Sequence, residues 1–212
     1  MSHPRVLVIG AGIVGASIAY HLARAGAEVT VVDAASPGGV ATAGSWAWIN
    51  ASAGNPEPYV RLRMRSMELW RDLDSSLSGL EVQWGGGLLW DLAPDDLRAY
   101  AAEHASWDYP VKLVDRDFVA RREPELASPP ELAVHVAIEG AVEPIHAATV
   151  LLDAAVAFGA RVIPGRAALA LRAVTGRVTG VQTAGGVVAA DEVVIAAGVG
   201  TPALLASVGI DL

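Results

Sequence analysis

A glycine-rich turn between a predicted strand and a predicted helix constrains the fold of this chain more than any other feature. Residues 10–15 read GAGIVG and match the pattern G-x-G-x-x-G. The apolar run Arg5–Ile9 predicts a strand buried on both faces of a parallel sheet, and the apolar spacing over residues 13–25 predicts a helix after the turn. A second apolar run, Glu28–Val32, completes a βαβ unit of the Rossmann type.

The glycines and the acidic residue after the second strand predict a dinucleotide-binding site. Gly10 allows the tight turn, Gly12 leaves room for a pyrophosphate, and Gly15 lets the helix pack closely on the strand. The helix N-terminus offers N–H groups and a positive dipole to the phosphates. Asp33 can accept hydrogen bonds from ribose hydroxyls. A turn without a ligand is the weaker alternative, because strand, helix and acid all occur at the expected spacing.

Composition limits the classes to which the chain can belong. Hydrophobic residues make up 53% and charged residues 18% of the 212 residues, which is typical of a globular chain. No apolar stretch approaches the roughly 20 residues that span a bilayer, and the first residues lack a signal-peptide pattern, so we expect a cytoplasmic protein with no integral membrane segment. The absence of cysteine excludes disulfides and Cys-ligated metals. The net charge of −8 argues against nucleic acid as a partner.

The rest of the chain predicts a mixture of helices and short strands. Residues 34–58 are rich in Gly, Ser, Ala and Pro and predict one long loop, which in a compact domain usually carries function. The predicted helices are 59–78, 94–105, 115–122 and 146–158. The predicted strands are two short pieces within 80–90, then 132–138, 161–163, a meander over 167–174, 178–183 and 187–189, and finally 193–196.

The order of elements after Asp33 distinguishes between two dinucleotides. An NAD-binding domain of the usual kind would continue directly with another βαβ unit. This chain instead enters the loop 34–58 and reaches the buried strand 193–196 only after a long insertion. That order favours FAD, and an NAD-dependent dehydrogenase remains the weaker alternative.

Several segments together resemble the FAD-dependent oxidoreductases of the D-amino-acid oxidase, glycine oxidase and sarcosine oxidase group. The resemblance runs over essentially the whole chain, and its segments are 8–33, 41–51, 139–144, the helix 146–158, and 191–201. It implies an α/β fold, with a Rossmann-like FAD/NAD(P)-binding domain and an inserted partial α+β substrate domain. The FAD-binding domain would comprise residues 1–55 and 145–212, and the substrate domain residues 56–144.

The resemblance also implies which residues approach the cofactor. The phosphate turn would be formed by Gly10, Ala11, Gly12, Ile13, Val14 and Gly15, with Asp33 and Ala34 at the ribose. The pyrophosphate and isoalloxazine would meet Thr42, Ala43, Ser45, Trp46, Ala47 and Trp48. The adenine would meet the backbone of Ala168, in the strand after the Gly159 turn, and the first glycine turn would adjoin Ala197 and Gly198. Some relatives bind flavin covalently through His or Cys, but this chain has Ser45-Trp46 there, so we expect non-covalent FAD.

Two groups of side chains have more than one interpretation. Trp46 and Trp48 belong either to the core or, as the resemblance favours, to the wall of the flavin pocket. Arg61, Arg63 and Arg65 form either a solvated helix face, the favoured interpretation, or an anion site. The histidines show no metal-ligand spacing, so we expect no metal.

The implied activity is oxidation of the C–N bond of an amino acid or a secondary amine. In the family, a hydride passes from the substrate carbon to flavin N5, and water hydrolyses the resulting imine. We assign no catalytic acid or base.

The family pattern continues beyond the equivalent of Leu212 into residues that grip the substrate carboxylate and close over the flavin. We therefore expect a fragment, a short homologue or one piece of a split protein. A homo-oligomer or a partner chain would then supply the missing part. A truncated FAD-binding module or subunit without activity of its own is the alternative function.

Overall fold

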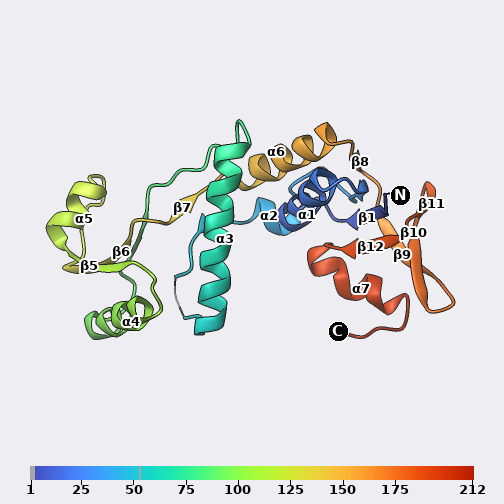
Figure 1. Cartoon of the computed structure of the whole chain (residues 1–212). Coiled ribbons are helices and arrows are strands. Elements are labelled where there is room, and N and C mark those ends of the chain that lie inside the picture. The colour runs from blue at the N-terminus through green and yellow to red at the C-terminus, as the bar shows by residue number, and fades with distance from the viewer. Residues whose placement is uncertain (1–2, 53) are drawn as a thin grey trace. The chain divides into compact units, whose positions relative to one another are not determined.

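The computed structural model describes residues 3–52 and 54–212. The chain divides into two compact units (Figure 1). The first unit comprises Met1–Ala47 and Glu143–Leu212, and the second unit comprises Trp48–Val142. The first boundary lies earlier than the predicted one at residues 55–56, because β3 (Trp48–Ile49) already pairs with β7 (Gly140–Ala141) inside the second unit. The assignment of one unit to the cofactor and the other to the substrate stays a prediction.

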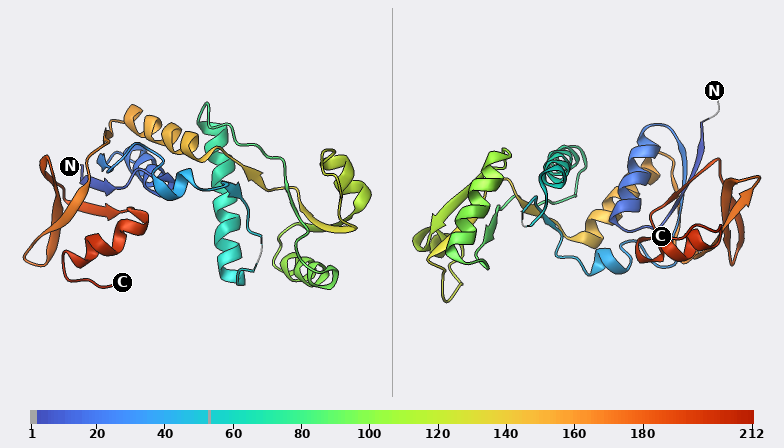
Figure 2. Two further views of the ribbon diagram at one scale, coloured as in Figure 1. Left: turned by 180° about the vertical axis from the view of Figure 1, so that it is seen from behind. Right: turned by 90° about the horizontal axis from the view of Figure 1, so that it is seen from below.

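The first unit contains the predicted parallel sheet. Its strand order is β12-β1-β2-β8, with the bounds β1 Arg5–Ile9, β2 Glu28–Val32, β8 Arg161–Ile163 and β12 Glu192–Ile195. All three strand pairs are parallel. Helices α1 (Ile13–Arg24) and α6 (Pro144–Ala157) pack against each other (Figures 1 and 2). Most of their buried residues are alanine or glycine. The βαβ unit predicted from the sequence is therefore confirmed.

A second layer of the first unit is the antiparallel meander that the sequence predicts. It consists of β9 (Ala168–Val174), β10 (Arg177–Thr183) and β11 (Gly186–Ala189), and α7 (Thr201–Ala206) follows β12 through the short helix η1 (Gly198–Gly200). Apolar side chains from the parallel sheet, the meander and α7 form one buried cluster: Leu7, Ile9, Val32, Leu171, Val181, Ala190 and Leu204. Leu7 and Ile9 of β1 belong to this cluster, and Val6 and Val8, which point to the other face of the sheet, are buried as well. Burial on both faces explains why β1 is apolar at every position after Arg5.

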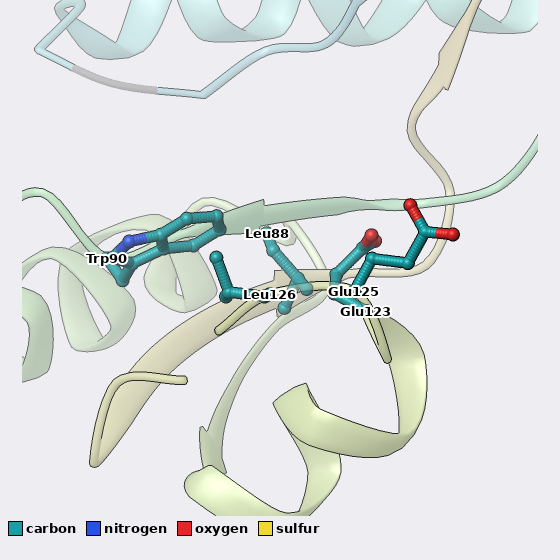
Figure 3. Close-up of a pocket in the computed structure, with 5 residues that line it drawn as sticks. All are labelled: Leu88, Trp90, Glu123, Glu125 and Leu126. Carbon is teal, nitrogen blue, oxygen red and sulfur yellow. The ribbon is translucent and has the colours of Figure 1, made fainter. Parts of the chain in front are cut away.

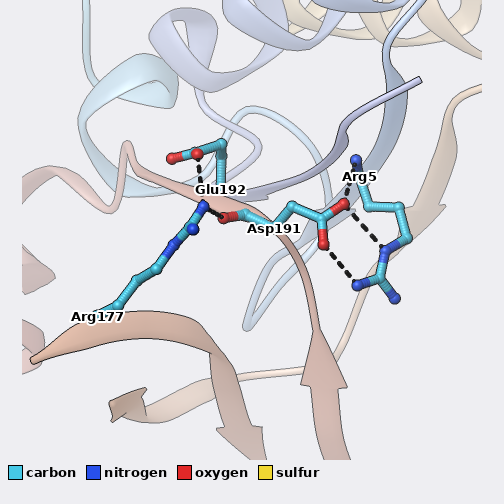
Figure 4. A network of polar contacts seen from close by, with 4 residues as sticks. All are labelled: Arg5, Arg177, Asp191 and Glu192. Carbon is cyan, nitrogen blue, oxygen red and sulfur yellow. Dashed lines mark hydrogen bonds and ion pairs between the residues drawn. The ribbon is translucent and has the colours of Figure 1, made fainter. Parts of the chain in front are cut away.

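An ion-pair network joins the beginning of β1 to the segment that enters β12 (Figure 4). Arg5 Nη2 lies 2.7 Å from Asp191 Oδ1, and the Arg5 backbone N–H donates to Oδ2 at 3.0 Å. Arg177 Nη2 donates to Glu192 Oε1 and to the Asp191 carbonyl, each at 2.9 Å. Hydrogen bonding from Arg5 lowers the pKa of Asp191 to about 2.

The described residues of the second unit form three helices and two small antiparallel sheets. The helices are α3 (Glu57–Ser76), α4 (Pro94–Ser106) and α5 (Arg116–Arg122). The larger sheet has the order β4-β6-β5, with the bounds Gly87–Leu89, Leu132–Val136 and Val111–Asp115, and the smaller sheet is β3-β7. No helix among the described residues is both long and apolar enough to cross a membrane.

Three sequence predictions need correction. Residues 34–58 are not one loop, because they contain α2 (Val40–Ala43), β3 and the first two residues of α3. Residues 80–90 hold one strand, β4, instead of two. Strand β5 was not predicted, because its half-exposed sequence VKLVD lacks a continuous apolar run and is held by pairing with β6.

Candidate cofactor site

The three glycines of the turn differ in what a side chain at each position would meet. A Cβ on Gly10, whose φ is 109°, would lie 2.2 Å from the Ala196 carbonyl oxygen, and a Cβ on Gly15 would lie 1.9 Å from the Gly10 carbonyl oxygen. A Cβ on Gly12 would meet only Thr42 Oγ1, at 3.1 Å. Gly10 and Gly15 are therefore required by backbone packing, whereas Gly12 keeps a space open in front of helix α1.

The N-terminus of α1 faces this space without a side-chain cap of its own. Ile13 N–H donates to Oγ1 of the buried Thr42 at 3.0 Å, and Gly38 N–H donates to the Ala11 carbonyl at 3.0 Å. Gly38 and Thr42 therefore lie against the glycine turn, and the contact of their segment with the cofactor stays a prediction. The remaining N–H groups of the first helical turn have no intrahelical acceptor and suit an anionic phosphate.

Asp33 closes β2 and also shapes the turn. Its Oδ2 accepts from Ala11 N–H at 2.6 Å, and its Oδ1 accepts from Ala35 N–H at 2.7 Å. The side chain is half-buried, and each carboxylate oxygen keeps a further lone pair. The carboxylate is thus held in place by the backbone and can still accept a ribose hydroxyl, a contact that stays a prediction.

The position of Ala168 differs from the expectation. The strand that directly follows the Gly159 turn is β8, and Ala168 is the first residue of β9, because Gly165 turns the chain between the two strands with a φ of 68°. The turn nevertheless lies beside the end of β2, since Arg166 N–H donates to the Asp33 carbonyl at 2.7 Å. The predicted contact of Ala168 with adenine stays a prediction.

The segment after β12 adjoins the first glycine of the turn. Ala196 N–H donates to the Ile9 carbonyl at 2.8 Å, and the Ala197 Cα would lie 3.2 Å from a Cβ on Gly10. Gly198 follows with a φ of 53°. Ala197 thus lies beside the first glycine of the turn, whereas the predicted cofactor contacts of Ala197 and Gly198 stay predictions.

Apolar side chains are exposed in segments that contain or adjoin the predicted cofactor residues of the first unit. Their exposed fractions are 61% for Val14, 86% for Val40, 89% for Trp46 and 87% for Val199. The core interpretation is therefore wrong for Trp46. Ala34, Ala43 and Ser45 are also exposed, and Ser45 Oγ accepts from Ala47 N–H at 2.9 Å.

Trp48 belongs to a buried polar network of the second unit. Its Nε1–H donates to Glu139 Oε2 at 2.9 Å, and the hydroxyls of Ser52 and Tyr109 donate to Oε1. Glu139 has an exposed fraction of 0%. Burial raises the pKa of Glu139, against the lowering effect of these three donors and of the Arg63 charge.

The sequence pattern did not single out this network, and Glu139 entered only as the first residue of the segment 139–144. The available signal was an acidic residue directly after the run 132–138, and this residue is buried in the structure. Ser52 and Tyr109 carry no such signal.

Arg61, Arg63 and Arg65 of α3 do not share one environment. Arg61 pairs with Glu57 at 2.7 Å and Arg65 pairs with Glu68 at 2.5 Å, both on the solvated face that the favoured interpretation predicts. Arg63 instead donates to Asn50 Oδ1 at 2.7 Å. Within residues 3–52 and 54–212, no group of three or more His, Asp or Glu side chains could hold a metal ion.

An open pocket of about 410 Å³ lies elsewhere in the second unit (Figure 3). It is lined by Leu88, Trp90, Glu123, Glu125 and Leu126. None of the residues predicted to bind the cofactor is among them, so this pocket does not bear on the cofactor site.

Comparisons with known proteins cover nearly the whole chain. The model of the family described as FAD dependent oxidoreductase matches residues 5–212. Glycine oxidase from Bacillus licheniformis is 29% identical over 211 residues, which cover 97% of this chain and 57% of the relative.

Two solved structures are also similar to this chain over nearly its whole length. The structure of L-proline dehydrogenase from P. horikoshii aligns with 99% of this chain, with a TM-score of 0.88 and 26% sequence identity. The structure of glycine oxidase from Geobacillus kaustophilus also aligns with 99% of this chain, with a TM-score of 0.88 and 25% identity. The matched region is 56% and 60% of those two chains. The chain thus spans little more than half the length of these relatives.

Proposed function

The chain belongs to the family of FAD-dependent oxidoreductases, and from this premise we propose that it serves in oxidation of the C–N bond of an amino acid or secondary amine, with non-covalently bound FAD. The observation that carries the proposal is the open space at Gly12, bordered by the N-terminus of α1 and by Thr42. The names of the relatives, glycine oxidase and L-proline dehydrogenase, support an amino-acid substrate.

The chain's own residues would hold the cofactor in three places. The N–H groups at the beginning of α1 would bind the pyrophosphate, Asp33 would accept a ribose hydroxyl, and the backbone of Ala168 would meet the adenine. Trp46 and Trp48 would shape the ring pocket, since indoles exclude water over a large flat surface.

When bound, FAD supplies the acceptor for a hydride from the substrate carbon, and water hydrolyses the imine that remains. The protein orients the substrate and excludes water from the reacting atoms. No acid or base of this chain is assigned to the reaction.

An absorbance spectrum of the purified chain with FAD tests cofactor binding. After removal of free FAD, we expect retained peaks near about 370 and 450 nm, which belong to the oxidised flavin ring. Turnover is then measured with an artificial electron acceptor and a panel of D-amino acids, glycine, sarcosine and proline. A chain that retains no flavin would contradict the proposal.

A second candidate function is an FAD-binding module or subunit that is inactive alone and acts with a second copy or a partner chain. The exposed side chains of Val14, Val40 and Val199 favour it, because apolar surface of this kind is often covered by a partner. Retained flavin without turnover would select this candidate. The cytoplasmic location expected from the sequence belongs to the same proposal and is tested by cell fractionation.

A further inference from the structure

Glu139 is a buried carboxylate that the proposed function does not use. It has an exposed fraction of 0%, and among the described residues three side chains of the second unit donate hydrogen bonds to it. Removing a carboxylate from water costs more free energy than burying an apolar side chain of similar volume. Stability of the second unit therefore does not by itself account for an acid at this position.

The network fixes the indole of Trp48. Trp48 pairs with Ala141 in the short sheet β3-β7, and Glu139 comes immediately before β7, so the two side chains meet where the two strands pair. A Cβ on Gly87 would lie 1.9 Å from Glu139 Oε2 and 3.1 Å from Trp48 Cζ2. The backbone at Gly87 thus closes on both side chains and leaves the indole little freedom.

The other oxygen of the carboxylate holds the chain that follows Trp48. Ser52 donates its hydroxyl to Oε1, as does Tyr109, whose oxygen also accepts from Ala51 N–H at 3.0 Å. One buried carboxylate therefore ties both ends of the segment 48–52 to the interior of the second unit.

We propose that Glu139 is a positioning residue that holds Trp48, the last residue of the loop expected to contact FAD, in one orientation. Glu139 would then promote FAD binding through Trp48 without touching the cofactor. This inference rests on the proposed function, in which Trp48 forms a wall of the flavin pocket.

The test compares Glu139→Met, which removes the acceptor oxygens at similar length, with Glu139→Gln, which keeps one acceptor. Each protein carries 5-fluorotryptophan at its six tryptophans, and the Trp48 resonance is identified by its absence in Trp48→Phe. We expect Glu139→Met to shift that resonance in FAD-free protein and to raise the Kd for FAD about tenfold or more, the factor that corresponds to a lost charged hydrogen bond. In Glu139→Gln, the Trp48 resonance and the Kd for FAD should both lie close to those of the unmodified chain.

Two further proteins make the result decisive. Trp48→Phe combined with Glu139→Met should bind FAD no more weakly than Trp48→Phe alone, because both changes act through the same indole. Glu131→Met removes an exposed carboxylate paired with Arg116 and should change neither the Trp48 resonance nor the Kd for FAD. An unchanged Trp48 resonance in Glu139→Met, or multiplicative losses in the double variant, would overturn the inference. Failure of the unmodified chain to bind FAD would refute the proposed function. In that case the Trp48 resonance, measured in FAD-free Glu139→Met and in the FAD-free unmodified chain, would still decide whether Glu139 holds Trp48.

Discussion

At the glycine turn, single residues differ in what a side chain would meet. A Cβ on Gly10 or Gly15 would lie within 2.2 Å of a backbone oxygen, whereas a Cβ on Gly12 would face open space except for Thr42 Oγ1. Substitution of Gly10 or Gly15 therefore tests folding, and substitution of Gly12 tests ligand binding.

We expect Gly12→Val to abolish measurable FAD binding, because its branched side chain would fill the space proposed for the pyrophosphate. The measurement is a titration of the chain with FAD, with circular dichroism to verify folding. Gly85→Val is the matched control, since a Cβ on Gly85 meets no atom within 4 Å. Unchanged FAD affinity in folded Gly12→Val would refute the assignment of the turn.

We expect Asp33→Ala to weaken FAD binding by about 1.5–3 kcal/mol, the usual range for a hydrogen bond to a charged group. The same change also removes the acceptors of Ala11 N–H and Ala35 N–H, so the free energy of unfolding should fall as well. Both quantities are measured, by FAD titration and by urea unfolding. Asp153→Ala in α6 is the control, and equal FAD affinity in Asp33→Ala and the unmodified chain would mean that other groups hold the ribose.

At the scale of elements, long-range pairing brings the functional segments together. The strands β1 and β12 are far apart in sequence, yet their pairing places Ala197 beside Gly10. The ion pair of Arg5 with Asp191 sits where these two strands begin, and it is exposed to solvent. The contribution of this ion pair to the free energy of unfolding should therefore depend on pH and on salt concentration.

The pKa of Asp191 is lowered to about 2 in the folded chain, chiefly by hydrogen bonding from Arg5. A carboxylate with a lowered folded pKa stabilises the fold above its unfolded pKa, and this stabilisation is lost as the pH falls through the folded value. We expect the stability difference between the unmodified chain and Asp191→Asn to be present at neutral pH and to vanish toward pH about 2. Urea unfolding across this range, at low and high salt, is the measurement, and a difference that persists at the acidic end would contradict the expectation.

At the scale of the whole molecule, a ligand that binds only the folded chain must stabilise it. FAD at about 100 times its Kd should raise the free energy of unfolding by about 2.7 kcal/mol. Because the glycine turn, Asp33 and the segment 38–44 all belong to the first unit, the effect should appear in the unfolding of that unit. Hydrogen exchange with and without FAD measures it, and Gly12→Val should show no stabilisation. Protection confined to the second unit would place the cofactor elsewhere.

The sequence by itself determines the βαβ unit, the meander and most of the helices. These elements depend on local signals: the apolar run of β1, the glycines at positions 10–15, and the apolar spacing of α1 and α6. The glycine turn could be assigned for the same reason, because every residue of its pattern lies within a few positions of the next.

Only the tertiary structure decided which distant side chains meet. Trp48 and Glu139 are 91 positions apart, and Ser52 and Glu139 are 87 apart, so no spacing pattern links them. The same holds for β3, whose two residues become a strand only by pairing with β7. It also holds for Arg63, which donates to Asn50, whereas Arg61 and Arg65 lie on the solvated face of α3. The physical reason is that local propensity acts over a few residues, whereas burial of a polar group is stabilised only by partners that folding brings from elsewhere in the chain.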